Sequence, residues 1–238
     1  MRVAVMQPYF VPYFGYFQLL HAVDRFVIYD DVQFTRSGWI HRNRIAVGGA
    51  PSWITLALRR DSDTLPVRER ALTEDFRARN AKLLRRVEGA YRSAPFFEEV
   101  RPLLDAVFGH DEPGLFAFVR HSVEVVAAHL GIETPLVTSS TLGVDPDLRG
   151  QDRVLAMAEA AGARTYVNPP GGVSLYDAKA FRARGMDLRF LQPAALVYAQ
   201  GAHDFLPSLS ILDALVHNPL DRIRARLDDY ALTDGAPR

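Results

Sequence analysis

Short apolar runs and amphipathic stretches alternate over the first part of the chain. Residues 3–6 form an apolar run that Pro8 stops, which is typical of a short buried strand. Residues 15–22 present apolar side chains on one helical face, and residues 25–29 are a second run rich in β-forming residues. A strand, a helix and a strand within about thirty residues predict the βαβ unit of a parallel sheet. Residues 53–58 are a further strand candidate.

Between about residues 73 and 130, apolar residues recur with the period of helices, and no strand is predicted. Three amphipathic helices are predicted there. They begin near Thr73, Ser93 and Asp111, and Gly131 is placed to end the last of them. The alternation then returns, with strands expected at 135–138, 164–167 and 187–191, and helices at 151–161, 177–184, 210–217 and 220–227.

The pattern as a whole predicts an α/β fold with a mainly parallel sheet. The chain has 238 residues, which suffices for one large core. We therefore expect a single domain, residues 1–238, with a helical insertion at about 73–130. Residues 233–238 have the composition of a disordered tail.

Composition narrows the classes of function. The 28 Lys and Arg residues balance the 28 Asp and Glu residues, so broad electrostatic capture of nucleic acid or of an acidic membrane is not expected. The chain has no cysteine, which excludes disulfides, thiolate nucleophiles and cysteine-ligated metals. The opening apolar run is shorter than that of a signal peptide, and no run approaches the roughly 20 apolar residues of a membrane span. We expect a cytoplasmic protein without nucleic-acid partners or membrane insertion.

Aromatic and proline residues crowd the turn after the first predicted strand, at residues 7–17. Ligands of open α/β sheets bind at the carboxyl ends of strands, and the start of the following helix favours an anionic group. The phenylalanines of this turn are interpreted as core. The other side chains have polar tips that need partners if buried, so four are candidate substrate-binding residues: Gln7, Tyr9, Tyr13 and Tyr16.

Acidic and basic residues follow the second predicted strand. Asp30 and Asp31 fall at its carboxyl end, where adjacent carboxylates can bind a cation or hydroxyl groups, or one can act as a general base. His41 is the histidine best placed for acid–base chemistry near neutral pH, and these three are the candidate catalytic residues. The alternative is a solvated charged turn. Arginines around a tryptophan suit a phosphate or carboxylate, so the rest of the segment is a candidate substrate clamp: Arg36, Trp39, Arg42, Asn43 and Arg44.

A Pro-Pro-Gly-Gly turn follows the strand predicted at 164–167. Backbone amides in such a turn can bind an anion, although proline and glycine also simply make turns. Tyr166, Asn168 and Tyr176 flank it and are the remaining candidate substrate-binding residues. The serine and threonine run at 139–141, after another strand, is a weaker candidate of the same kind. The chain lacks the motifs of zinc proteases, P-loop proteins and nucleophile-elbow hydrolases.

Several of these segments together resemble the WbqC-like protein family. They extend in order from the first residues almost to the last, at 6–19, 27–33, 38–45, 162–168 and 209–215. The resemblance implies a biosynthetic, transferase-like role in pathways for bacterial surface polysaccharides or specialised metabolites. It implies no particular catalytic residue.

The turn at residues 13–16 also looks like the His-x-Gly-His turn of nucleotidyltransferases and class I synthetases, which holds nucleotide phosphates at a helix N-terminus. This similarity implies a sheet of Rossmann-like, nucleotidyltransferase-like type. Tyr13 and Tyr16 replace both histidines and no lysine-rich loop is present, so the fold can be shared while the reaction is not.

Three functions remain open. The leading hypothesis is acyl or aminoacyl transfer to an amine or hydroxyl of a sugar or carrier-bound intermediate. In it, Asp30 or His41 is the general base and the arginines hold an anionic group of the substrate. The second is nucleotidyl transfer, with Asp30 and Asp31 binding magnesium. The third is a ligand-binding protein without catalysis. No cofactor is indicated by the motifs, and the leading hypothesis assigns no metal site.

Overall fold

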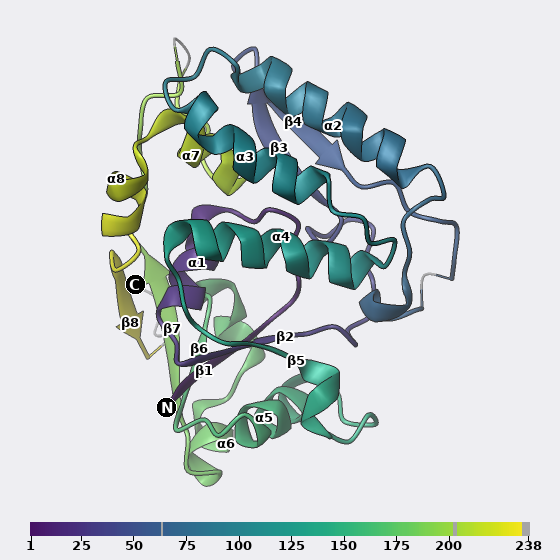
Figure 1. Ribbon diagram of the computed structural model, residues 1–238. Helices are drawn as coiled ribbons and strands as arrows, with labels where there is room; N and C mark the ends of the chain where they lie inside the picture. The colour runs from purple at the N-terminus through teal and green to yellow at the C-terminus, as the bar shows by residue number, and fades with distance from the viewer. Residues whose placement is uncertain (63, 202–203, 235–238) are drawn as a thin grey trace.

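The apolar runs form the central sheet of the computed structural model, which describes residues 1–62, 64–201 and 204–234. The strands lie in the order β5-β2-β1-β6-β7-β8 (Figure 1). The first five are parallel, and β8 runs antiparallel to β7. Their bounds are Arg2–Met6 for β1, Arg25–Ile28 for β2, Leu136–Thr138 for β5, Thr165–Asn168 for β6, Asp187–Pro193 for β7 and Tyr230–Thr233 for β8. The mainly parallel α/β sheet is confirmed.

Alternate residues of the strands point into two separate apolar cores, one on each face of the sheet. In β1, Ala4 packs into one core, whereas Val3 and Val5 pack into the other. In β2, Phe26 and Val27 are divided in the same way. Because a parallel sheet is covered on both faces, its strands are continuously apolar.

Helices cover both faces of the sheet, with α2, α3 and α4 stacked on one side and α5 and α6 on the other (Figure 1). The first side comprises α1 (Phe14–His21), α2 (Phe76–Tyr91), α3 (Phe97–Phe108), α4 (Leu115–Leu130), α7 (Ile211–His217) and α8 (Leu220–Ala225). The second comprises α5 (Gly150–Ala160) and α6 (Ala178–Ala183). Short 3₁₀ turns lie at Val67–Glu69 (η1), Ser139–Leu142 (η2) and Pro170–Leu175 (η3). The three helices expected between about 73 and 130 are therefore α2, α3 and α4.

A two-stranded hairpin, β3 (Arg42–Val47) and β4 (Ala50–Thr55), stands apart from the sheet. Gly48 and Gly49 connect its strands with φ angles of 58° and 76°, left-handed values that favour glycine in a two-residue hairpin turn. The strand predicted at 53–58 is thus corrected to Ala50–Thr55, because the turn fixes where pairing begins. Its partner β3 was expected only as a charged binding segment.

The disordered tail was predicted for residues 233–238, and Thr233 corrects that boundary because it is the last residue of the edge strand β8, which pairs with β7. Residues 235–238 lie outside the described residues.

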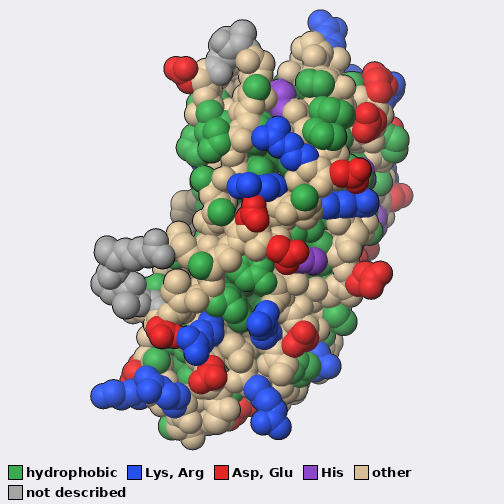
Figure 2. Space-filling model, turned by 90° about the vertical axis from the view of Figure 1, so that its left-hand side faces the viewer, with side chains coloured by type: hydrophobic (Ala, Val, Ile, Leu, Met, Phe, Trp, Pro, Cys, Tyr) green, Lys and Arg blue, Asp and Glu red, His purple; other side chains and the backbone are tan. Residues whose placement is uncertain are grey.

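Surface charge is mixed in sign on the face that Figure 2 shows. Lysine, arginine and acidic side chains are interspersed there around a central group of apolar side chains, in keeping with a formal net charge of zero. None of the helices in the described part of the chain is long and apolar enough to cross a membrane.

Candidate functional site

The carboxyl ends of β1 and β6 lie side by side at the point where the order of strands reverses. From β1 the sheet extends to β2 and β5 on one side and to β6 and β7 on the other. Loops leave such adjacent strands in opposite directions, which opens a crevice for ligands. A cavity of about 610 Å³, here called the large chamber, lies over these ends. Its polar side chains follow the strands or begin α5: Gln7, Tyr9, Tyr29, Gln151, Asn168 and Tyr176.

A second cavity of about 350 Å³, the small chamber, adjoins the large one and shares Met6, Tyr9, Pro169 and Gly171 with it. Its remaining polar and aromatic side chains include Tyr13, Trp39, Asn43 and Ser208. Among the described residues, no acidic or basic side chain lines either chamber. A ligand there would meet phenols, amides and aromatic rings.

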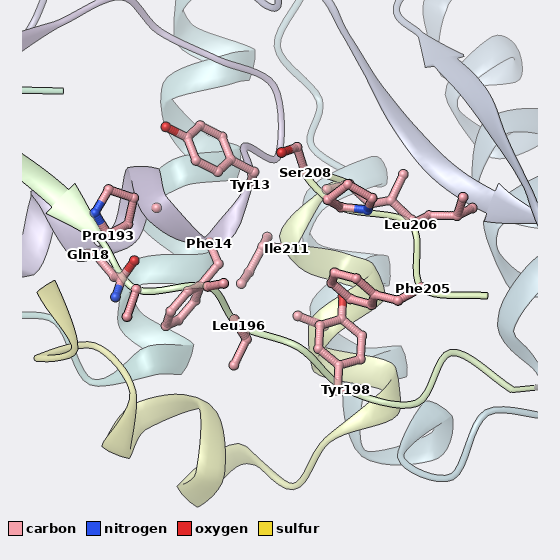
Figure 3. A pocket seen from close by; sticks show the side chains of 17 residues that line it. Tyr13, Phe14, Gln18, Pro193, Leu196, Tyr198, Phe205, Leu206, Ser208 and Ile211 are labelled. Carbon is pink, nitrogen blue, oxygen red and sulfur yellow. The ribbon is translucent and has the colours of Figure 1, made fainter. Parts of the chain in front are cut away.

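A third cavity of about 230 Å³, the apolar pocket, shares Tyr13 and Ser208 with the small chamber (Figure 3). Apolar side chains from three segments converge on it, among them Phe14, Leu196 and Ile211. The three cavities therefore adjoin in series, from a polar chamber to an apolar one.

Internal hydrogen bonds fix the aromatic turn that lines these cavities. The Asn43 side-chain amide donates to the carbonyl oxygens of Phe10 and Val11, at 2.9 Å each. These bonds hold Val11 at a φ of 37°, a left-handed value that a β-branched residue rarely adopts. At Gly15, a Cβ atom would lie 2.5 Å from a ring carbon of Tyr13, so a larger residue at the start of helix α1 would displace that ring. The turn is therefore held by contacts within the protein.

Hydrogen bonds and a close backbone contact also hold the turn after β6. The Tyr166 hydroxyl donates to Asn168 Oδ1 at 3.0 Å, and Asn168 Nδ2 donates to the carbonyl of Pro169 at 3.0 Å. A Cβ atom on Gly172 would lie 1.9 Å from Asn168 Nδ2, so a larger residue in η3 would displace this amide. Asn168 thus lines the large chamber from a fixed position.

Tyr9, Tyr13 and Tyr29, three of the four tyrosines that line the chambers, are hydrogen-bond donors at neutral pH. Burial raises the pKa of Tyr9, with a smaller contribution from Tyr13, and burial also raises the pKa of Tyr13. Burial is again the main cause of the raised pKa of Tyr29, although Arg153 acts against it. All three phenols keep their protons, so they can stabilise a developing negative charge but cannot act as bases.

The predicted acidic pair lies behind the chambers and joins β2 to the end of β5. Asp30 is buried, and its carboxylate accepts from the Ser139 hydroxyl at 2.7 Å and from the Ser140 amide and hydroxyl at 2.9 and 2.8 Å. The Asp31 carboxylate lies 2.6 Å from the same Ser139 hydroxyl and forms an ion pair with Arg153. The acidic pair therefore acts as a clip between two strand ends.

The arginines of the predicted clamp do not lie together, because two belong to strand β3 and Arg36 precedes it. Arg42 and Arg44 point to one face, where their guanidinium groups lie 4.3 Å from the Trp53 ring centroid and 5.3 Å from that of Trp39. The two indole rings are 5.4 Å apart. Arg36 is not part of this stack and lines a separate cavity with His41.

The structure brings together about half of the predicted site residues. Those that line the two chambers are Gln7, Tyr9, Tyr13, Trp39, Asn43, Asn168 and Tyr176. Tyr16 and Tyr166 are buried beneath them, and the Tyr16 hydroxyl donates to the carbonyl of Gln7 at 3.1 Å. Those that line neither chamber are Asp30, Asp31, Arg36, His41, Arg42 and Arg44.

Sequence reasoning missed Tyr29, Gln151 and Ser208 as lining residues. Tyr29 had a usable signal, because it is the first residue after β2, and the carboxyl ends of parallel strands meet at one edge. Ser208 had none, since its place in the site follows from a long loop that returns to the aromatic turn. Its φ of 56° marks a constrained backbone there.

Comparisons with known proteins agree along nearly the whole chain. Residues 7–225 match the model of the WbqC-like protein family. The chain is also similar to Uncharacterized protein Rv1507c of Mycobacterium tuberculosis (strain ATCC 25618 / H37Rv), with 29% identity over 234 residues that cover 96% of each protein. No solved structure matches the chain.

Proposed function

The chain belongs to the WbqC-like protein family, and we propose that it is a group-transferring enzyme whose two substrates meet in the large and small chambers. The transferred group is an acyl or aminoacyl group, and the acceptor is an amine or hydroxyl of a sugar or carrier-bound intermediate. The setting is the one that the family resemblance implies, the biosynthesis of a surface polysaccharide or a specialised metabolite in the cytoplasm.

One observation carries this proposal: three cavities of different character adjoin in series. A transfer reaction needs two substrates held side by side, and an acyl donor needs an apolar surface beside its reactive carbonyl. We assign the acyl chain to the apolar pocket and its carbonyl to the small chamber. The acceptor would occupy the large chamber, whose amides and phenols suit a hydroxyl-rich molecule.

The strand order supports the Rossmann-like type. Numbered along the sheet, β1, β2, β5, β6 and β7 are its first to fifth strands, and their spatial order corresponds to 3-2-1-4-5. The doubly wound dinucleotide-binding sheets have this order and bind ligands beside its central strand. The large chamber lies at that place.

The chemistry that suits these chambers is acyl transfer to an amine. The acceptor nitrogen would attack the acyl carbonyl carbon, and the phenols of Tyr9 and Tyr13 would donate hydrogen bonds to the oxyanion that forms. The bond from that carbon to the leaving group then breaks, and the nitrogen releases its proton to the leaving group or to water. An amine in its neutral form needs no base for the attack, and no carboxylate or imidazole among the described residues lines the chambers. We therefore favour an amine over a hydroxyl acceptor.

Nucleotidyl transfer receives less support from the geometry. It requires the carboxylates of Asp30 and Asp31 to bind magnesium. The oxygens of Asp30 already accept three hydrogen bonds from Ser139 and Ser140, and Asp31 pairs with Arg153.

A transfer assay tests the proposal. The protein would be incubated with acyl, aminoacyl and nucleotide donors in the presence of amino-sugar and neutral-sugar acceptors, and the products would be identified by mass spectrometry. Tyr13→Phe, which removes an oxyanion donor, should lower kcat by about 10²-fold. Tyr230→Phe removes a phenol from β8 outside the chambers and should leave kcat unchanged. Metal-dependent release of pyrophosphate would instead support nucleotidyl transfer, and tight binding with no product from any donor would support a ligand-binding protein.

A further inference from the structure

Five arginines surround a cavity that the proposed reaction does not use. It has a volume of about 430 Å³ and shares no lining residue with either chamber. Its walls come from the segment after β2, the segment after β4 and the start of α2. Among the described residues, no acidic side chain lines it. The ionisable residues that do are Arg36, His41, Arg59, Arg60, Arg70 and Arg79. We call it the arginine cavity.

Arg70 is a buried positive charge without a carboxylate partner among the described residues. Its side chain is 3% exposed, and it donates to the carbonyls of Ser62 at 2.9 Å and Arg59 at 3.3 Å. Its guanidinium carbon lies 4.8 Å from the ring centroid of Phe34. Arg70 Nε is buried and has no hydrogen-bond acceptor within the described part of the chain. Carbonyl oxygens and an aromatic ring compensate the charge of a buried guanidinium only partly. We therefore expect an anion to bind beside Arg70.

His41 adds a second unpartnered group on the same cavity. Its Nδ1 atom is buried and has no hydrogen-bond partner among the residues that the structure describes. Burial first, and then the charges of Arg42, Arg70 and Arg36, lower the pKa of His41 to about 4. The imidazole is therefore neutral at neutral pH and can donate a hydrogen bond.

Protein groups compensate part of the positive charge. Arg79 contacts Asp75, with Nε 2.8 Å from Oδ1, and Arg36 also has a partner. The buried Arg70 Nε and His41 Nδ1 are polar atoms of this cavity that have no hydrogen-bond partner in the described part of the chain. Arg59, Arg60 and Arg70 line the same cavity, and no ion pair involves them within the described ranges. Guanidinium groups bind phosphate oxygens in pairs, and convergent arginines are the usual means of phosphate recognition.

We propose that the arginine cavity binds the phosphate or diphosphate group of a small molecule. The volume lies within the range of about 300–1,000 Å³ that is typical of small-molecule sites. A single inorganic phosphate would leave most of it empty, so the ligand carries further atoms or a second phosphate. This site is additional to the transfer reaction, since the two share no residue.

Isothermal titration calorimetry with inorganic pyrophosphate tests the proposal at about 0.15 M salt, where diffuse surface attraction is screened. The wild-type protein should bind one pyrophosphate, and the double variant Arg59→Gln, Arg60→Gln should bind it at least about tenfold more weakly. The matched control is Arg85→Gln, Arg92→Gln, which removes two exposed arginines on and beside α2 away from the cavity. It should retain the wild-type affinity, as should Tyr29→Phe in the large chamber.

A second readout follows the ring of His41 by NMR. Bound pyrophosphate places negative charge beside the imidazole, so it should raise the pKa of His41 measurably in the wild-type protein. Equal weakening in the test and control arginine variants would overturn the proposal, because it would mean diffuse attraction. Absence of binding, or binding that leaves His41 unmoved, would overturn it as well.

Discussion

Polar residues of the candidate site differ in what their atoms already bond. Asn43 and Tyr16 use their side chains to hold backbone carbonyls of the aromatic turn, and Asn43 also lines the small chamber. Gln7 and Tyr9 lie in the same turn and face a chamber. From the sequence, all four look alike, because the residue type is the same whether its polar tip meets the backbone or a ligand. The candidate site could therefore be placed on the correct turn, but not resolved into lining and supporting residues.

Asn43→Ala should destabilise the fold. The substitution removes two buried hydrogen bonds and leaves the carbonyl of Phe10 without its donor, which costs about 1–3 kcal/mol of unfolding free energy. Urea denaturation measures this. Thr55→Val, at an exposed position of the same hairpin, is the control and should change stability little. A variant as stable as the wild type would show that the turn does not depend on this amide.

His41 should make stability depend on pH. Its folded pKa of about 4 lies below the ordinary histidine value of about 6.5, so between these values the unfolded chain binds a proton that the folded chain does not. The unfolding free energy should therefore rise with pH between about 4 and about 6.5. The contribution of His41 to stability is fully present above about 6.5 and is lost as the pH falls towards 4. Urea denaturation of the wild type and of His41→Gln at several pH values compares the slopes. The slope should be smaller in the variant, and equal slopes would contradict the assignment.

At the scale of elements, the acidic pair ties two strands that are far apart in sequence. Asp30 and Asp31 follow β2, and Ser139 and Ser140 follow β5, its parallel neighbour. The helical insertion separates them along the chain, so their contact arises only when the two strands pair. This explains why the sequence suggested a catalytic pair, or a solvated charged turn, whereas the structure gives both carboxylates partners within the protein.

Ser139→Ala should weaken this clip without altering a carboxylate. Its hydroxyl is buried and bonded to a charged group, so its loss should cost about 1.5–3 kcal/mol of unfolding free energy. Asp30→Asn should be destabilising by a similar amount. Ser174→Ala, at an exposed position in η3, is the control for denaturation. If Asp30→Asn abolished transfer while Ser139→Ala affected neither stability nor transfer, Asp30 would be catalytic instead of structural.

The elements that sequence reasoning found are those with strong local signals. The five parallel strands of the sheet and helices α2 to α4 have continuous or helical apolar patterns, and both arise from neighbouring residues. The hairpin was not predicted, and its second strand was placed at 53–58, although Gly48-Gly49 is a two-residue hairpin signal that could have fixed its register. β8 was not predicted; it pairs antiparallel with β7, a contact between segments about forty residues apart that its own four residues do not indicate.

At the scale of the whole molecule, the helical insertion shares one apolar core with the sheet. Residues of β1, β2, α2, α3 and α4 belong to the same cluster of buried side chains. A buried carboxylate strengthens this connection. Asp213 in α7 accepts from the hydroxyls of Tyr91 at 2.8 Å and Tyr198 at 2.7 Å, and from Gln200 Nε2 at 2.7 Å. We therefore expect the chain to behave as a single domain.

Thermal unfolding should show a single cooperative transition. Tyr91→Phe removes one donor from the buried carboxylate and should lower the unfolding free energy by about 1–3 kcal/mol while keeping one transition. Tyr230→Phe serves as the matched control. Calorimetry that resolved two transitions, one of them moved alone by Tyr91→Phe, would show that the insertion unfolds separately.

The position of a bound donor tests the central claim most directly. A crystal structure of the protein with an acyl or aminoacyl donor, chosen by the transfer assay or by retention in native mass spectrometry, would locate it. We predict that the acyl group lies in the apolar pocket and the reacting carbonyl lies in the small chamber, within hydrogen-bonding distance of Tyr9 or Tyr13. A donor bound away from the carboxyl ends of β1 and β6, with both chambers empty, would contradict the account.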